Sequence, residues 1–420
     1  MRVKLPAHEA TTAQLGAAYP CVATRRLAAA GVLIGRDLFG GAFVHDPFDL
    51  YRAGAITNPN MLVLGQIGRG KSAFVKSYLL RQAAFGRRIV ILDPKGEYGP
   101  FARALGTDPI TLRPGGAVRL NPLEIARGAN RDEPGGAQAR ISLVGDLASA
   151  CLGRRLGPAE HTAVELALDA TCRGTVPPTL SAVVAAMLAP SPEAARAVGC
   201  RASDLAADGR EVGLELRRLV TGELAGMFDG VTTPGVDLCA RVVVIDLSHV
   251  YSSPALGALV TCAAAALNRV WDRPGTDKTF LVIDEGWAVV HNPGAARFLQ
   301  ASFKLARARG VANIVVVHRV SDFAASGPAG SVAVRLAEGL VADCETVVCY
   351  AQADAELPAA ERLLGLSEAE SRLLPRLRRG VALWRVGTRP YLVEHRLAPG
   401  EREIVDTDRR LVATRSDTRR

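Results

Sequence analysis

The chain has 420 residues, of which 49% are hydrophobic and 22% are charged, and its formal net charge is +9 at pH 7. This length and composition exclude a mainly disordered chain and leave room for two or three domains with a large core. The longest almost uncharged apolar run, residues 255–267, is too short for a bilayer span, which takes about 20 residues. The first residues also lack the apolar segment of a signal peptide, so we expect a cytoplasmic protein.

The eight cysteines indicate neither a metal site nor a disulfide framework. None forms a C-x-x-C pair, and no histidine stands at zinc-finger spacing. We therefore expect small buried hydrophobic residues in a reducing compartment. The basic tail, residues 401–420, is either a solvated terminus or a contact for an anionic partner.

The first sheet pattern begins at residue 61. Residues 1–60 mix short apolar runs with turns, and we expect an N-terminal extension that leads into the core. Residues 61–64 are an unbroken apolar run, residues 71–86 have helical spacing, and residues 88–92 are apolar again. This strand–helix–strand order predicts a parallel sheet.

Residues 128–235 interrupt the sheet pattern. A linker-like stretch at 128–140 precedes an Ala- and Leu-rich helical pattern, so we expect an inserted all-α subdomain. Strand patterns then return, and their alternation with helices predicts an α/β fold, a mostly parallel sheet flanked by helices. The expected elements are strands at 241–246, 280–284, 313–317 and 346–350, helices at 253–271 and 294–309, a capped helix from Ser367, and a hairpin of 381–386 with 390–395.

One loop has the composition of a phosphate-binding site. Residues 65–72, GQIGRGKS, match G-x-x-x-x-G-K-[ST] between a strand pattern and a helix pattern. Glycines let successive backbone N–H groups converge on phosphate oxygens, and the helix N-terminus adds its dipole. We expect Lys71 to reach the β- and γ-phosphates of ATP and the Ser72 hydroxyl to bind Mg²⁺. The predicted nucleotide-binding residues are Gly65, Gln66, Ile67, Gly68, Arg69, Gly70, Lys71, Ser72 and Ala73.

Two acids end another apolar strand pattern, in the form of a Walker B motif. Asp284 and Glu285 follow the run FLVI. We expect Asp284 to hold Mg²⁺ and Glu285 to polarise the attacking water, since a hydrolysing ATPase needs both functions. The alternative is an ordinary strand that ends in acids at a loop.

Further polar residues follow strand patterns. His318 follows the run NIVVV and is a candidate sensor of the γ-phosphate. The alternative is a histidine at the end of a strand whose hydrogen bonds are made with nearby backbone groups. Asp93, Glu97 and Asn121 are expected at the sheet edge where open α/β sheets bind ligands. Their residue types alone predict no chemistry.

Taken in order, these segments resemble the ATPases of type IV secretion and conjugation of the TraC kind, within the HerA/FtsK superfamily. The resemblance covers roughly residues 30–410. It rests on LVLGQIGRGKS (62–72), RRIVILDPKGEY (87–98), LNPLE (120–124), VVVIDLSHV (242–250), LVIDEGWAVV (281–290) and LGLSEAESRLLPRLRRGVALWRVG (364–387).

The resemblance implies a RecA-like P-loop NTPase that forms a ring, a hexamer, at the inner face of the cell membrane. It implies that the chain binds ATP and Mg²⁺ and works with a membrane-embedded secretion or conjugation complex. It also implies that an arginine from the neighbouring subunit completes each nucleotide site. The candidates for that arginine are Arg307, Arg309, Arg319 and Arg335. The expected division is an extension at 1–60, an ATPase domain at 61–127 and 236–400, the helical subdomain at 128–235, and the tail at 401–420.

Two departures from the family pattern matter. The family has glutamine where this chain has His318, although imidazole can still donate to a phosphate. Family members also commonly carry an N-terminal domain that meets the membrane complex, and in its place we expect either a separate chain or a different mode of docking. The favoured function is a motor that couples ATP hydrolysis to assembly of, or transfer through, a membrane complex. The alternatives are a DNA translocase or coupling protein that acts on DNA, and a feebly hydrolysing scaffold protein, against which Glu285 argues.

Overall fold

A single large sheet organises the molecule. The computed structural model describes residues 30–124, 136–173, 177–251, 253, 256–271, 278–286, 293–321 and 332–406. Within these residues, eleven strands pair in the order β2-β1-β11-β10-β9-β3-β8-β7-β4-β6-β5. The strands are β1 Val32–Asp37, β2 Gly41–His45, β3 Met61–Leu64, β4 Arg88–Asp93, β5 Ile110–Thr111, β6 Val242–Asp246, β7 Thr279–Ile283, β8 Val311–Val317, β9 Thr346–Cys349, β10 Val381–Val386 and β11 Arg389–His395.

The part of the sheet from β9 to β5 is parallel. β3 pairs with β8 on one side and with β9 on the other, and β4 lies between β7 and β6. Every residue of β3, β4, β7 and β8 is buried, as expected of parallel strands that helices cover on both faces. The carboxyl ends of these strands therefore lie at one edge, where the candidate residues follow them.

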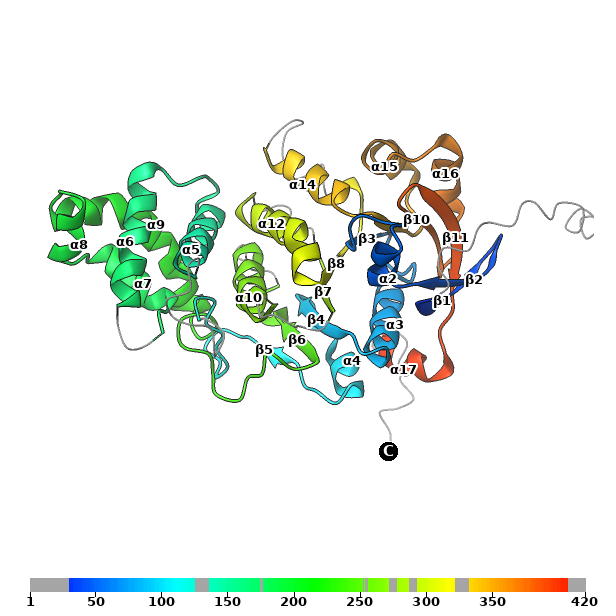
Figure 1. Ribbon diagram of the computed structural model, residues 1–420, viewed down its shortest axis with the longest axis horizontal. Helices are drawn as coiled ribbons and strands as arrows, with labels where there is room; N and C mark the ends of the chain where they lie inside the picture. Colours follow the sequence, from blue (N-terminus) through cyan, green and yellow to red (C-terminus); the bar gives the residue numbers. More distant parts are fainter. Residues whose placement is uncertain are drawn as a thin grey trace, which may run out of the picture.

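The remaining strands extend the sheet in antiparallel fashion. β10 pairs with β9 and with β11, and the expected hairpin of β10 and β11 turns at Gly387. β1 then pairs with β11 and with β2. The strands of residues 32–45 thus belong to the same sheet as the parallel strands, next to one of the last strands of the chain (Figure 1).

Alternate residues of the parallel strands face two separate cores. Leu62 and Leu64 of β3 point into one core, together with residues of α10, α12 and α14. Met61 and Val63 point into the other, with residues of α2, α3 and α4. Figure 1 shows α3 and α4 on one side of the sheet and α10 and α12 on the other. These helices are α2 Pro47–Arg52, α3 Lys71–Ala84, α4 Gly99–Ala104, α10 Leu256–Trp271, α12 Pro293–Arg309 and α14 Val332–Ala342.

A group of helices lies between β5 and β6 in the sequence and beyond α10 and α12 in space (Figure 1). α5 packs against both α10 and α12, and α7 packs against α6 and α9. This group comprises α5 Gly136–Leu152, α6 Pro158–Cys172, α7 Leu180–Leu188, α8 Pro192–Ala197 and α9 Ala202–Val220. Short helices near the end are α15 Leu357–Leu364, α16 Glu368–Leu373 and α17 Arg402–Val405, and α16 begins with the expected capping box at Ser367.

The mostly parallel sheet with flanking helices is thus confirmed. In the described part of the chain, no helix has both the length and the apolar character needed to cross a membrane. The basic residues 409, 410, 415, 419 and 420, as well as residues 287–290 of the quoted run LVIDEGWAVV, lie outside the described residues.

Candidate nucleotide-binding site

The loop at 65–70 joins the end of β3 to the start of α3, as the motif predicts. Gly65 has φ +149°, and a Cβ there would lie 2.4 Å from Cβ of Tyr350. Gly70 has φ +110° and caps α3. Only glycine adopts such backbone geometry at low cost, so the loop can pass close to β9 and then enter the helix. The backbone N–H of Gln66 donates to the carbonyl of Ala351 at 3.0 Å, which fixes the loop to the chain after β9.

Lys71, the first residue of α3, folds back over this loop. Its Nζ donates to the carbonyl oxygens of Gly65 and of Gln66, the latter at 2.9 Å, and the residue is only 4% exposed. Ser72 and Ala73 follow half-buried in the first turn, whereas Ile67 at the tip of the loop is 80% exposed. The ammonium therefore lies inside the loop that is expected to surround phosphate.

The two acids at the end of β7 are both buried. Asp284 is 5% exposed and Glu285 2% exposed. Burial and the adjacent Glu285 carboxylate raise the pKa of Asp284. Glu285 also has φ +54°, a left-handed conformation that is uncommon for a residue with a side chain. The backbone N–H of Gly286 donates to the Val316 carbonyl at 2.9 Å, so the turn is held against β8.

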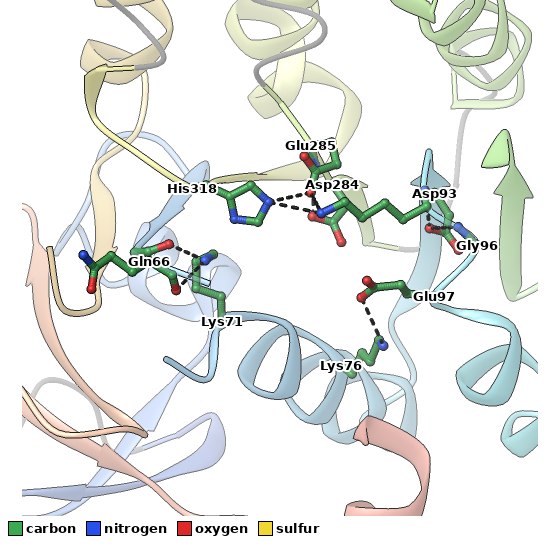
Figure 2. Close-up of polar contacts among 11 residues, drawn as sticks. Gln66, Lys71, Lys76, Asp93, Gly96, Glu97, Asp284, Glu285 and His318 are labelled. Atoms are coloured by element: carbon green, nitrogen blue, oxygen red, sulfur yellow. Dashed lines mark hydrogen bonds and ion pairs between the residues drawn. The ribbon is translucent and has the colours of Figure 1, made fainter. Parts of the chain in front are cut away.

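Side chains that follow the two strands adjacent to β7 contact Glu285, and Figure 2 shows one of them, His318, directed at this carboxylate. His318, at the end of β8, brings Nε2 to 2.7 Å from Oε1 of Glu285. Lys95, after β4, brings Nζ to 2.5 Å from the same oxygen and to 3.2 Å from Nε2 of His318. Burial alone would lower the pKa of Lys95, but contact with the Glu285 carboxylate raises it above its usual value. Sequence reasoning assigned no role to Lys95, although it lies in the quoted run DPKGEY.

Asp93 shapes the loop that carries Lys95. Its carboxylate accepts hydrogen bonds from the backbone N–H groups of Lys95, Gly96 and Tyr98 at 3.2, 2.9 and 2.9 Å. Burial raises the pKa of Asp93 to about 6, although these hydrogen bonds oppose the shift. The carboxylate thus holds the turn after β4 in place.

Glu97 and Asn121 have different surroundings. Glu97 is 4.0 Å from the ammonium of Lys76, a fully buried side chain of α3 whose pKa is lowered by burial. Figure 2 shows the side chains of Glu97 and Lys76 directed toward each other. Asn121 instead donates to the carbonyl of Pro178 and accepts from the N–H of Leu123, so it joins the chain after β5 to the start of the α7 region.

The four arginine candidates lie on three elements. Arg307 and Arg309 end α12, Arg319 follows His318, and Arg335 lies in α14. Arg309 is half-buried and the other three are exposed.

The residues present fit a magnesium ion that is held mainly by a nucleotide. Among the described side chains, no group of three or more His, Cys, Asp or Glu is arranged as a metal site. Mg²⁺ in nucleotide sites takes only one or two protein ligands and completes its octahedron with phosphate oxygens and water. The buried carboxylate of Asp284 and the hydroxyl of Ser72 supply ligands of that type.

Comparison with known proteins agrees with this geometry. A family described as an AAA-like domain matches residues 52–130, which include the loop, α3 and β4. The structure is similar to that of VirB4 of Thermoanaerobacter pseudethanolicus, with a TM-score of 0.70 and 25% identity, over 90% of this chain and 99% of that chain. The search of curated proteins gives no match.

Other solved structures share the fold at lower identity. The bacterial conjugative coupling protein TrwB in its unbound monoclinic form aligns with a TM-score of 0.59 and 16% identity, over 93% of this chain and 92% of that chain. TrwB in complex with ADP and Mg²⁺ aligns with a TM-score of 0.60 and 17% identity, over 93% of each chain. These comparisons confirm the expected RecA-like P-loop fold and the resemblance to the ATPases of type IV secretion and conjugation.

Proposed function

We propose that this chain is an ATP-hydrolysing motor of a conjugative transfer or type IV secretion-like apparatus. The observation that carries the proposal is the likeness to VirB4 over nearly the whole of both chains, with the loop at 65–72 and the acids at 284 and 285 at one edge of the sheet. Hydrolysis would drive assembly of, or transfer through, a membrane complex. A fold alone does not define an activity, so the proposal also depends on the chemistry of these residues.

The phosphate loop and the first acid would bind the nucleotide. The backbone N–H groups of residues 65–73 would surround the phosphates, and Lys71 would exchange its carbonyl partners for phosphate oxygens. Ser72 and Asp284 would hold Mg²⁺, which supplies charge neutralisation between the β- and γ-phosphates. TrwB, of the same fold, is described in complex with ADP and Mg²⁺ and with an ATP analogue.

The second acid would act on water. Glu285 lies one residue beyond Asp284, and its carboxylate would accept a hydrogen bond from the attacking water and orient it. His318 contacts that carboxylate and would report on the γ-phosphate through the same hydrogen bond. Glu285, Lys71 and His318 are therefore the proposed catalytic residues.

The assembly that we propose is a homo-oligomeric ring, a hexamer, at the inner face of the cell membrane. One of Arg307, Arg309, Arg319 and Arg335 would complete the site of the neighbouring subunit, where an arginine stabilises the charge of the transition state. The helices α5–α9 would form a subdomain inserted into the ATPase domain, within residues 128–235. The ring would work with a membrane-embedded secretion or conjugation complex.

ATP turnover of the purified chain tests this function. Lys71→Ala should abolish nucleotide binding or turnover, whereas Glu285→Gln should bind ATP and fail to hydrolyse it. Light scattering in the presence of ATP gives the mass of the assembly. If both variants hydrolyse ATP at the rate of the parent chain, the assignment of the site is wrong.

A DNA translocase or coupling protein is the second candidate, because coupling proteins align over 93% of this chain. Turnover that DNA stimulates, with binding that weakens steeply as salt increases, would favour this candidate. An ATP-dependent ring that is indifferent to DNA favours the secretion motor.

A further inference from the structure

Lys95 is a cationic side chain that contacts Glu285, the second of the two buried acids that follow β7. Its Nζ is 2.5 Å from Oε1 of Glu285, while 28% of its own side chain is exposed. It reaches this position from β4, which pairs with β7, so the contact crosses between two adjacent strands. Figure 2 shows Glu285 next to Asp284, with His318 directed at the same carboxylate.

The charge around the two acids explains why a cation is needed there. Two consecutive carboxylates, 5% and 2% exposed, repel each other, and water does not screen buried charges well. The other two lysines of the region have different contacts: Lys71 donates to loop carbonyls, and Lys76 is 4.0 Å from Glu97. Lys95 therefore supplies a positive charge in direct contact with the Glu285 carboxylate.

The same contact has a consequence for Glu285. Its Oε1 is within hydrogen-bond distance of both Lys95 and His318, so this oxygen is already engaged. These two contacts set the direction of the carboxylate, and a group that orients water must point at the position of that water. The left-handed backbone of Glu285 is held by these surroundings, because such a conformation persists where neighbouring contacts over-determine it.

We propose that Lys95 is the built-in counter-ion of Asp284 and Glu285, which balances their charge in the metal-free chain and gives way when Mg²⁺ binds. Lys95 is then a positioning residue that makes release of Glu285 depend on Mg²⁺. This inference rests on the proposed function, since it takes Asp284 as the Mg²⁺ ligand and Glu285 as the group that orients water.

Thermal unfolding of the full nucleotide-free chain tests the inference without turnover. Lys95→Gln should lower the Tm in EDTA, because the acids lose their counter-ion, and MgCl₂ at constant ionic strength should restore it. The Mg²⁺ concentration that gives half of this recovery should be about tenfold lower than the concentration that raises the Tm of the parent chain. The reason is that a nearby charge changes the affinity for an ion by one or more powers of ten. Lys95→Arg, which keeps the charge, should behave like the parent.

Two further variants separate charge balance from simple packing. Lys278→Gln removes a lysine just before the other end of β7, where it lies over the Phe48 ring, and should give no Mg²⁺-specific recovery. The double variant Lys95→Gln/Glu285→Gln should lose less stability than the sum of the single variants, because one of the two acids no longer needs a cation. If Lys95→Gln does not fold in any buffer, folding of this double variant supports the inference, and failure of both overturns it.

An unchanged Tm in Lys95→Gln, or a loss that Mg²⁺ does not reverse, would overturn the inference. These outcomes are distinct from failure of the proposed function, which appears as absent ATP turnover in the parent chain. A parent that hydrolyses ATP while Lys95→Gln shows no response to Mg²⁺ would leave the function standing and remove only the role of Lys95.

Discussion

The carboxylate of Glu285 and the imidazole of His318 meet at 2.7 Å although 33 positions of sequence separate them. Their strands, β7 and β8, are parallel neighbours, so the residues after both strands emerge at the same edge of the sheet. Nε2–H of His318 can donate to Oε1 of Glu285, which would fix the direction of the carboxylate. Nδ1 of His318 is buried without a hydrogen-bond partner among the described residues.

We expect His318→Ala to lower kcat for ATP by about tenfold to a hundredfold, because a misplaced reacting group costs rate even when substrate still binds. The KM should change little. His318→Gln should retain more activity, since an amide N–H can replace the imidazole donor. Steady-state kinetics measure both parameters, and nucleotide affinity measured with a fluorescent analogue serves as the control. A change in KM alone, with kcat unchanged, would contradict a role through Glu285.

The phosphate loop and the strand and helix on either side of it were predictable because their signals are local. Glycine spacing, Lys71 and an apolar strand before the loop all lie within a dozen positions. The meeting of Glu285 with His318 follows once both strands are taken as parallel. The contact of Lys95 with Glu285 was not predicted. It requires β4 to lie next to β7, and no pattern within one segment of sequence shows which strands are neighbours.

The antiparallel part of the sheet shows the same limit. The turn at Gly387 predicted the hairpin of β10 and β11, but not its pairing with β9 and β1. β1 and β11 are separated by most of the chain, and long-range pairing leaves little trace in either segment. The turn residues therefore predicted the hairpin, whereas the pairing of the hairpin with distant strands could not be predicted.

Gly65→Ala should destabilise the fold and weaken nucleotide binding. A Cβ at this position would lie 2.4 Å from Cβ of Tyr350, and the φ of +149° is unfavourable for alanine. Such a clash with a packed neighbour typically costs about 1–3 kcal/mol. Gly68→Ala is the matched control, because it also has positive φ but no atom within 4 Å of its added Cβ. Urea unfolding and nucleotide titration should show the larger loss at Gly65, and equal losses would refute the steric argument.

Acid should destabilise the protein through its buried histidines. Burial lowers the pKa of His45 to about 4, and burial with the nearby charge of Arg81 lowers that of His395 to about 4. In the unfolded chain a histidine titrates near 6.5. The unfolded state therefore binds the proton first as pH falls, so stability is complete above about pH 6.5 and declines toward pH 4, by up to about 3 kcal/mol per histidine.

Urea unfolding between pH 4 and 8 measures this dependence. His395→Gln should flatten the decline, because its side chain does not titrate and can still bond Ser77, which is now 2.7 Å from Nε2. His249→Gln, at an exposed position, should leave the slope unchanged. If the free energy of unfolding of His395→Gln falls with pH as steeply as that of the parent chain, other groups cause the acid sensitivity.

Arg81 should be the strongest single link between the helix that follows the phosphate loop and the antiparallel strands. From the last turn of α3, its Nε and Nη2 donate to the two carboxylate oxygens of Glu401 at 2.7 and 2.6 Å. It also donates to the carbonyls of Leu33 and Arg396. Glu401 is 8% exposed on its side chain, so removal of Arg81 leaves a largely buried charge without its partner.

We therefore expect Arg81→Ala to lower the free energy of unfolding by about 2–4 kcal/mol, as measured by urea denaturation. Arg81→Lys should recover only part of this loss, because an ammonium cannot reproduce the two parallel hydrogen bonds of the guanidinium. Arg52→Ala breaks an exposed ion pair with Asp49 and should cost under about 1 kcal/mol. Comparable losses in Arg81→Ala and Arg52→Ala would mean that α3 is held by its apolar face alone, with Phe74 and Tyr78 in the core.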